Sequence, residues 1–114
     1  MKHIKIAAGL AHVNYGNIAG IVKEISDAGV DYIHSDAADM HDLKNMKLMG
    51  GHQIIAGILP VTDKPIECHI YTVSMERMFI EQINEAGADM LIVPAEHFLG
   101  AQLAYIINWC REHH

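Results

Sequence analysis

Short apolar runs alternate along the chain with stretches in which apolar residues recur every three or four positions. Apolar runs of this length predict strands over residues 3–10, 30–33, 65–71 and 90–94. The periodic stretches between and after them predict four helices, each with one apolar face. Strands and helices therefore follow one another as βαβαβαβα. This order predicts an α/β fold with one parallel sheet and right-handed crossovers.

The helices have predictable boundaries and buried faces. The first helix ends at Gly29, and either Asn14 or Asn17 is able to cap its start. Ser74 is the predicted amino-terminal cap of the third helix, and residues 37–50 are predicted to form a long loop. The fourth strand is apolar enough to be buried on both faces. The predicted buried side chains are Met78, Phe79 and Ile83 in the third helix and Leu103, Ala104, Ile106, Ile107 and Cys110 in the last.

A short internal repeat marks two helix-to-strand corners. Residues 27–31 read Asp-Ala-Gly-Val-Asp and residues 85–89 read Glu-Ala-Gly-Ala-Asp, 58 positions apart. That spacing is expected of two βαβα units placed one after the other. Eight such strands close a TIM barrel of ~250 residues, and this chain has 114. The sequence therefore predicts a single domain over residues 1–114, a (β/α)4 half of a TIM barrel with parallel strands that is completed by self-association.

Self-association is expected because a four-stranded half-barrel has two open edges and one uncovered sheet face. The residues expected to be left uncovered on that face are Leu10, Ile33, Ile70 and Ile92. At ~25 cal/mol per Å², leaving several hundred Å² of apolar surface in water costs on the order of 10 kcal/mol. We therefore predict a homodimer or a higher homo-oligomer, since closed twofold dimers are the commonest oligomers.

Candidate chemistry gathers where two of the predicted strands end. His34 and Asp36 are two residues apart, so both side chains lie on one side of the strand. The third strand also has a histidine, His69, near its carboxyl end. Imidazole and carboxylate groups suit a divalent cation, or a base held beside one. The alternative is that these are polar residues at strand ends that are hydrogen-bonded and inert.

Composition narrows the classes of function. Half of the chain is apolar (51%), 19% is charged and the net charge is −6, which together indicate a folded globular domain. No cluster of lysine or arginine indicates nucleic-acid binding, and no apolar run reaches the ~18 residues of a membrane helix. The two cysteines do not form a C-x-x-C pair, so they are predicted to be reduced, buried thiols of a cytoplasmic protein. The amino terminus does not have the pattern of a signal peptide.

Set out in this way, the chain from Ile6 to about Glu96 resembles the amino-terminal half of ribulose-phosphate 3-epimerases. Residues 28–36, Ala-Gly-Val-Asp-Tyr-Ile-His-Ser-Asp, look like that family's A-G-A-D-W-I-H-V-D. Residues 66–70, Ile-Glu-Cys-His-Ile, look like its L-D-V-H-L, and residues 85–89 match its E-A-G-A-D. Weaker matches are residues 6–10 with I-A-P-S-I, 14–17 with D-F-A-N, Asp39 and His41 with D-G-H, and Asn45 with the asparagine of F-V-P-N.

The resemblance implies roles for individual residues. It makes His34, Asp36 and His69 three of the family's four metal ligands, and it makes Asp36 one of two catalytic carboxylates. The implied cofactor is a divalent metal ion, whether zinc, iron, manganese or cobalt, and the implied substrate is a phosphorylated ketose epimerised at C3. Gly9 stands where the family has serine and Tyr71 where it has methionine, so both are candidate substrate-binding positions at which this chain differs. The fourth ligand, the second carboxylate and the phosphate-binding loops belong to the second half of that family's barrel.

Three functions follow from these observations. The first is a metal-dependent isomerase, a sugar-phosphate epimerase in which two copies complete one barrel. The second is an inactive half-barrel that binds a metal or a partner, or a truncated piece of a full-length epimerase-like barrel. The third is a histidine-rich metal-binding module, because the chain has nine histidines, scattered along it. Isomerase activity on a pentulose phosphate separates the first from the others.

Overall fold

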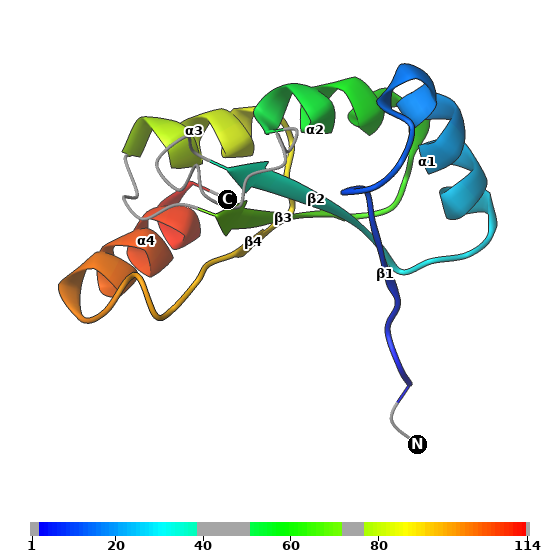
Figure 1. Cartoon of the computed structure of the whole chain (residues 1–114). Helices are drawn as coiled ribbons and strands as arrows, with labels where there is room; N and C mark the ends of the chain where they lie inside the picture. Colours follow the sequence, from blue (N-terminus) through cyan, green and yellow to red (C-terminus); the bar gives the residue numbers. More distant parts are fainter. Residues whose placement is uncertain (1–2, 39–50, 72–76, 114) are drawn as a thin grey trace.

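A four-stranded parallel sheet organises the chain in the computed structural model, which describes residues 3–38, 51–71 and 77–113 (Figure 1). The strands lie in sequence order, so each strand pairs in parallel with the next. This arrangement confirms the predicted α/β fold with a parallel sheet. The strands are β1 (Ala7–Gly9), β2 (Tyr32–Ala38), β3 (Ile66–Tyr71) and β4 (Met90–Ile92). The helices are η1 (Tyr15–Asn17), α1 (Ile18–Asp27), α2 (His52–Ile58), η2 (Leu59–Val61), α3 (Arg77–Glu85) and α4 (Ala101–Glu112).

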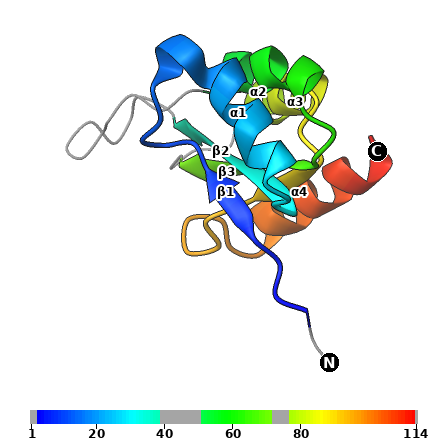
Figure 2. The same ribbon diagram turned by 90° about the vertical axis from the view of Figure 1, so that its right-hand side faces the viewer.

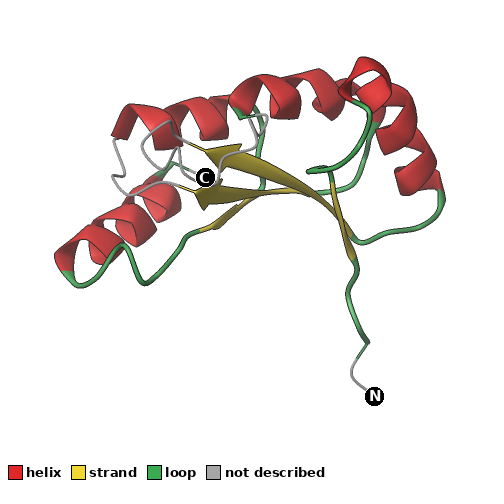
Figure 3. Ribbon diagram, viewed as in Figure 1, coloured by secondary structure: helices red, strands yellow, loops and turns green. Residues whose placement is uncertain are grey.

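Helices cover only one face of this sheet. Figure 3 shows α1, α2 and α3 in a layer above the strands, and Figure 2, turned by 90°, shows the same layer above the strands with α1 in front. Helix α4 packs through Ile106 and Trp109 against Ile80 of α3, with Leu91 of β4 beside them. Among the described residues, no helix lies on the opposite face of the sheet, which we call the open face.

The hydrophobic core fills the space between the sheet and the helix layer. Side chains that alternate along β2 and β3 point into it, and α1 and α2 supply the facing side. Its fully buried members include Val22, Ile33, Ile55, Ile58, Ile66, Cys68 and Ile70.

The prediction that Leu10, Ile33 and Ile70 would be left uncovered is therefore wrong. Leu10 is 1% exposed and both isoleucines are 0% exposed, because these three point towards the helices. Only the fourth residue, Ile92, is partly exposed and pairs in register with the open-face residue His69. The prediction put Ile33 and Ile70 on the wrong face of their strands. A shift of one residue is enough for this, because neighbouring residues of a strand point to opposite faces. The open face therefore has ionisable side chains along β2 and β3, with the apolar residues Met90 and Ile92 on β4 beside them, and the expected apolar driving force for association is smaller than predicted.

The internal repeat forms two equivalent corners. Gly29 has φ +92° and Gly87 has φ +94°, a left-handed conformation that ends each helix. Two residues later, Asp31 accepts a hydrogen bond from Ile6 N at 2.8 Å and donates its own N–H to Ile6 O at 2.9 Å. Asp89 forms the same pair of bonds with Ile66, both at 2.8 Å. Each aspartate thus joins its strand to the start of the neighbouring strand, so the repeat is structural as well as sequential.

Several local predictions need correction. β4 is not buried on both faces, because Met90 is 44% exposed at the edge of the sheet. In α3, Met78 is 62% exposed. In α4, Ala104 and Ile107 are exposed, while Trp109 is buried in their place. The apolar periodicity correctly predicts that Ile83 and Ile106 are buried. It fails for residues that lie one position outside the buried face of each helix.

Of the two asparagines predicted as caps, Asn14 caps the 3-10 turn that leads into α1. Asn14 accepts a hydrogen bond from Gly16 N at 3.0 Å and so caps η1, whereas Asn17 makes no side-chain cap bond at α1. Residues 37 and 38, predicted as loop, complete β2. The rest of the predicted 37–50 loop and the Ser74 cap lie outside the described residues. In the parts of the chain that are described, no helix has both the length and the apolar character needed to cross a membrane.

Candidate metal centre

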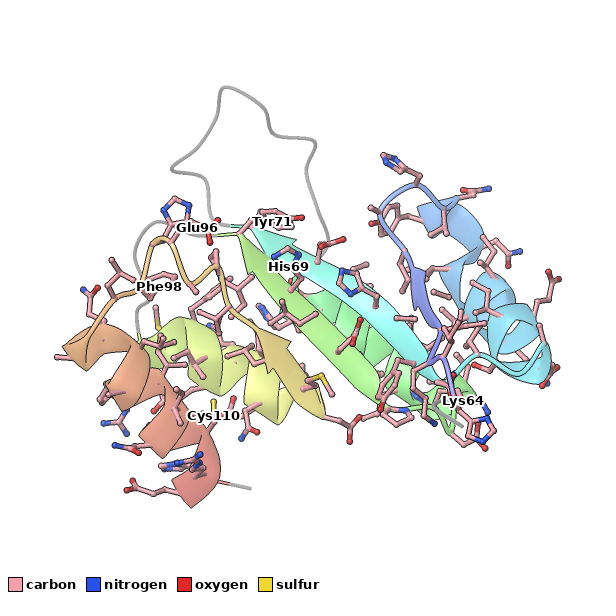
Figure 4. The ribbon with its side chains drawn as sticks, turned by 90° about the horizontal axis from the view of Figure 1, so that it is seen from below. Lys64, His69, Tyr71, Glu96, Phe98 and Cys110 are labelled. Carbon is pink, nitrogen blue, oxygen red and sulfur yellow. The ribbon has the colours of Figure 1, made fainter. Side chains whose placement is uncertain are left out.

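Three predicted ligands come together on the open face. His34 and Asp36 belong to β2, His69 belongs to β3, and Asp36 is the register partner of His69. In Figure 4, which looks onto the open face, His69 and Tyr71 lie at the arrowhead end of β3 and Lys64 lies near its start. One correction concerns their place in the strand. β2 continues to Ala38, so His34 and Asp36 lie within the strand and do not follow it.

The distances between these side chains are short. His34 Nε2 lies 3.3 Å from Asp36 Oδ1, and His69 Nδ1 lies 3.6 Å from the same oxygen. One ligand atom from each residue falls within 4.8 Å of the other two. The two imidazole rings meet edge to face, with 5.9 Å between their centroids. The predicted convergence of His34, Asp36 and His69 is therefore confirmed.

The donor set suits a divalent cation. Zinc ligands of these types lie ~2.0–2.2 Å from the ion, so the ligand atoms of one site lie close together, as the atoms of this group do. Two imidazole nitrogens and one carboxylate oxygen are also ligands used by iron, manganese and cobalt in proteins. This group can therefore hold a divalent metal ion.

The three side chains of this group are largely buried. The Asp36 side chain is only 8% exposed, and those of His34 and His69 are each 23% exposed. Burial of a carboxylate has a free-energy cost unless positive charge or hydrogen-bond donors compensate it. On the helix-covered face of the sheet, burial and then the nearby charge of Asp36 raise the pKa of the Cys68 thiol to about 12. Cys68 therefore stays protonated and, being on the helix-covered face, is not one of the ligands.

A fourth polar residue, Glu67, was missed as a site residue by the sequence reasoning. It is the register partner of His34, and its Oε1 lies 2.7 Å from His34 Nδ1. Its side chain is 13% exposed. The signal was present in the sequence, because Glu67 and His69 are two residues apart on β3, as His34 and Asp36 are on β2.

The two predicted substrate-binding positions flank this group. Gly9 is the register partner of His34 on β1, and a Cβ added at Gly9 would meet nothing within 4 Å. Tyr71 is 47% exposed and its ring lies 4.1 Å, centroid to centroid, from that of His69. Both residues therefore border open space beside the three ligands.

Other residues named in the sequence analysis either lie outside the described residues or lie apart from this group. Asp39, His41 and Asn45, which the resemblance included, lie outside the described residues. The histidines of the described segments that lie apart from the group are His3, His12, His52, His97 and His113. Where the structure is described, only His34 and His69 among the histidines belong to a potential metal group.

Comparisons with known proteins show which family this chain resembles in sequence. A model of the ribulose-phosphate 3 epimerase family matches residues 5–113. The chain is 30% identical over 111 residues to a ribulose-phosphate 3-epimerase of Synechocystis, an alignment that covers 97% of this chain and 47% of the relative. It is 32% identical over 93 residues to the Bacillus subtilis ribulose-phosphate 3-epimerase, covering 82% of this chain and 42% of the relative. The chain thus spans less than half the length of these two curated relatives.

Proposed function

Since the chain belongs to the ribulose-phosphate 3-epimerase family, we propose that it contributes the metal-binding part of an epimerase active site that acts at C3 of a phosphorylated ketose. The observation that carries this proposal is the approach of His34, Asp36 and His69 to within 4.8 Å on the open face. In a TIM barrel the corresponding face lines the interior, and active sites form at the carboxyl ends of the strands. The 30–32% identity to proteins that are named epimerases supports the reaction type.

The reaction removes a proton from the carbon next to a carbonyl group and returns one to the opposite face. We assign the proton transfer on one face to Asp36, whose Oδ1 is shared between His34 and His69. His34, Asp36 and His69 would hold the metal. A bound divalent cation supplies positive charge that stabilises the negative charge developing on the carbonyl oxygen. Zinc, iron, manganese and cobalt all remain candidates on this donor set.

Gly9 and Tyr71 are proposed to contact the substrate. Their support is position, since Gly9 faces His34 in register and the Tyr71 ring lies beside His69. The open space at Gly9 leaves room for a substrate group where the family's motif has a serine side chain. A cytoplasmic location is part of the same proposal.

Metal analysis combined with a proton-exchange assay tests the proposal. The purified chain is loaded with zinc, manganese or cobalt, dialysed, and assayed for deuterium incorporation at C3 of a pentulose phosphate in D2O. About one metal ion per chain with measurable exchange supports the epimerase. Bound metal without exchange favours the inactive metal-binding half-barrel. Absence of bound metal in the wild-type chain contradicts the proposal.

We further propose that a single domain over residues 1–114 pairs with a second copy to complete the barrel. Within the described residues, β1 and β4 each pair with one neighbour only, so both outer edges have unpaired backbone groups. A twofold axis along the strands would join β4 of each copy to β1 of the other and bring the two open faces together. Because β2 and β3 present ionisable side chains on the open face, we expect this pairing to depend on backbone hydrogen bonds more than on apolar burial.

Light scattering at micromolar concentration tests the dimer. We expect a mass of twice the 12.6 kDa chain. A stable mass of one chain would show that two copies do not complete the barrel, while leaving the metal proposal to be judged by its own experiment.

A further inference from the structure

The side-chain carboxylate of Glu67 has a single polar partner in the described part of the chain. Its carboxylate oxygen Oε1 lies 2.7 Å from Nδ1 of His34, on the neighbouring strand. The backbones of β2 and β3 already pair over six consecutive positions, from Ile33 to Ala38 on β2, so the sheet does not need this side-chain contact. The Glu67 side chain is only 13% exposed, and burying a carboxylate has a free-energy cost. Because the fold gains little from this one contact, we look for its role in the site.

The contact fixes which nitrogen of His34 carries the proton. An ionised carboxylate only accepts hydrogen bonds, so Nδ1 of His34 must be the donor. In a neutral imidazole the other nitrogen, Nε2, then has a free lone pair. Nε2 is the atom that lies 3.3 Å from Asp36 Oδ1. The free lone pair is thus the one aimed at the candidate metal position.

Without Glu67 the proton of His34 would have a different best acceptor. Asp36 Oδ1 would be the remaining carboxylate oxygen close to the ring, and it lies beside Nε2. The proton would move to Nε2 and donate to Asp36. That tautomer removes the lone pair of His34 from the metal position and also occupies the oxygen of Asp36.

We propose that Glu67 is a positioning residue that holds His34 in the Nδ1–H tautomer and so keeps Nε2 free for the metal. The inference rests on the metal site proposed above. Partners of this kind, which hold the second nitrogen of a metal-binding histidine, change metal affinity by ~10–100-fold when they are removed.

The test compares four variants with the wild-type chain. Glu67→Ala removes the carboxylate, and Glu67→Gln keeps the shape and one acceptor oxygen without the charge. Glu67→Asp shortens the side chain by one methylene, to the residue that the resembling family motif has. Glu24→Ala removes an exposed glutamate on α1 and is the matched control. Circular dichroism confirms that each variant folds.

The first measurement is the tautomer of His34 in the metal-free protein, from the ring-nitrogen chemical shifts in 15N NMR at neutral pH. We expect the Nδ1–H form in the wild type, in Glu24→Ala and in Glu67→Gln. We expect the Nε2–H form to gain in Glu67→Ala. An unchanged tautomer in Glu67→Ala overturns the inference, whether or not the protein binds metal.

The second measurement is zinc and cobalt affinity by competition with a chelating indicator. We expect Glu67→Ala to bind ~10–100-fold more weakly and Glu24→Ala to bind as tightly as the wild type. Glu67→Gln and Glu67→Asp should lie between, because each retains an acceptor for His34. Equal affinity in Glu67→Ala and the wild type also overturns the inference. If the wild type itself binds no metal, the proposed metal site fails, and the tautomer measurement still decides whether Glu67 directs the proton of His34.

Discussion

Four carboxylates of the sheet divide into two pairs that differ in what they contact. Asp31 and Asp89, at the amino-terminal ends of β2 and β4, accept hydrogen bonds from backbone N–H groups of the neighbouring strand. Asp36 and Glu67, further along β2 and β3, lie beside imidazole rings. The first pair uses its acceptor capacity to join strands. The second pair faces groups that can exchange protons or share a metal. The partner of each carboxylate thus indicates whether it serves the fold or the chemistry of the site.

This difference predicts opposite effects of substitution in the two pairs. Changes in the Asp31 and Asp89 pair should lower stability and spare metal binding. Changes in the Asp36 and Glu67 pair should do the reverse, because removing a partly buried charge from a strand that is already fully paired costs the fold little. A variant that changes both properties strongly would break the comparison.

The largest effect is expected for Asp36→Asn. The amide keeps the shape of the side chain but does not accept a proton, so exchange at C3 should fall by ~10²–10⁴-fold. Deuterium incorporation from D2O, followed by mass spectrometry, measures this rate. Asp31→Asn is the control at the other pair and should exchange at the wild-type rate. Undiminished exchange in Asp36→Asn would rule out the proton-transfer role of Asp36.

Metal should stabilise the folded chain through the group that includes Asp36, and the Asp31 and Asp89 pair should not affect this. A ligand at 100 times its Kd that binds only the folded state adds about 2.7 kcal/mol to the free energy of unfolding. We expect zinc or cobalt to raise the Tm of the wild type and of Asp89→Ala by similar amounts. His69→Ala, which removes one of three ligands, should lose this rise. Thermal melts with and without a chelator measure it, and an equal rise in His69→Ala would show that the metal binds elsewhere.

Asp89→Ala should destabilise the chain even without metal. It leaves the backbone N–H of Ile66, a 0% exposed residue, without its acceptor. An unsatisfied buried donor costs ~1–3 kcal/mol. Asp89→Asn should cost less, since the amide oxygen can still accept from Ile66 N. Urea unfolding measures both, and equal losses in the two variants would show that the charge of Asp89 matters more than its hydrogen bond.

The element order and the shared face of two candidate ligands, His34 and Asp36, were predictable from the sequence because both depend on local pattern. The residues of β2 alternate, so His34 and Asp36 share a face in any strand that contains them. The repeat at Gly29 and Gly87 likewise needs only the local chain, because a left-handed residue must end each helix before the strand begins.

What the sequence did not yield depends on which face the helices cover. Ile33 and Ile70 were expected on the open face. Each is the chain neighbour of a histidine, His34 or His69, that lies on that face, so the isoleucines point the other way. Periodicity fixes that neighbouring residues point to opposite faces, but only packing decides which face is buried. Glu67 was missed for a related reason. Its spacing from His69 puts it on the same face of β3. Its contact with His34, 33 positions earlier, comes from strand pairing, which no local pattern contains.

The smallest effect is expected at Asp31, the member of the folding pair that also forms an ion pair. Lys5 Nζ lies 2.8 Å from Asp31 Oδ1. The hydrogen bond from Lys5, followed by that from Ile6 N, lowers the pKa of Asp31 from its ordinary value of 3.8. The contribution of Asp31 to stability is therefore present above pH 3.8 and is lost as the pH falls through the lowered pKa.

Lys5 sets the alkaline limit of the pH range in which this ion pair contributes to stability. The hydrogen bond to Asp31 raises the pKa of Lys5 above its ordinary value of 10.5, so its contribution is complete below pH 10.5 and is lost as the pH rises through the raised pKa. Lys5→Met should remove the alkaline loss and reduce the acid loss, because Ile6 N still holds Asp31. Both side chains are solvent-exposed, so the difference between variant and wild type should be small and should vanish in ~1 M salt, where charges are screened within ~3 Å. Tm measured from pH 3 to 11 at low and high salt tests this, and a salt-independent loss in Lys5→Met would mean that the lysine stem contributes packing rather than charge.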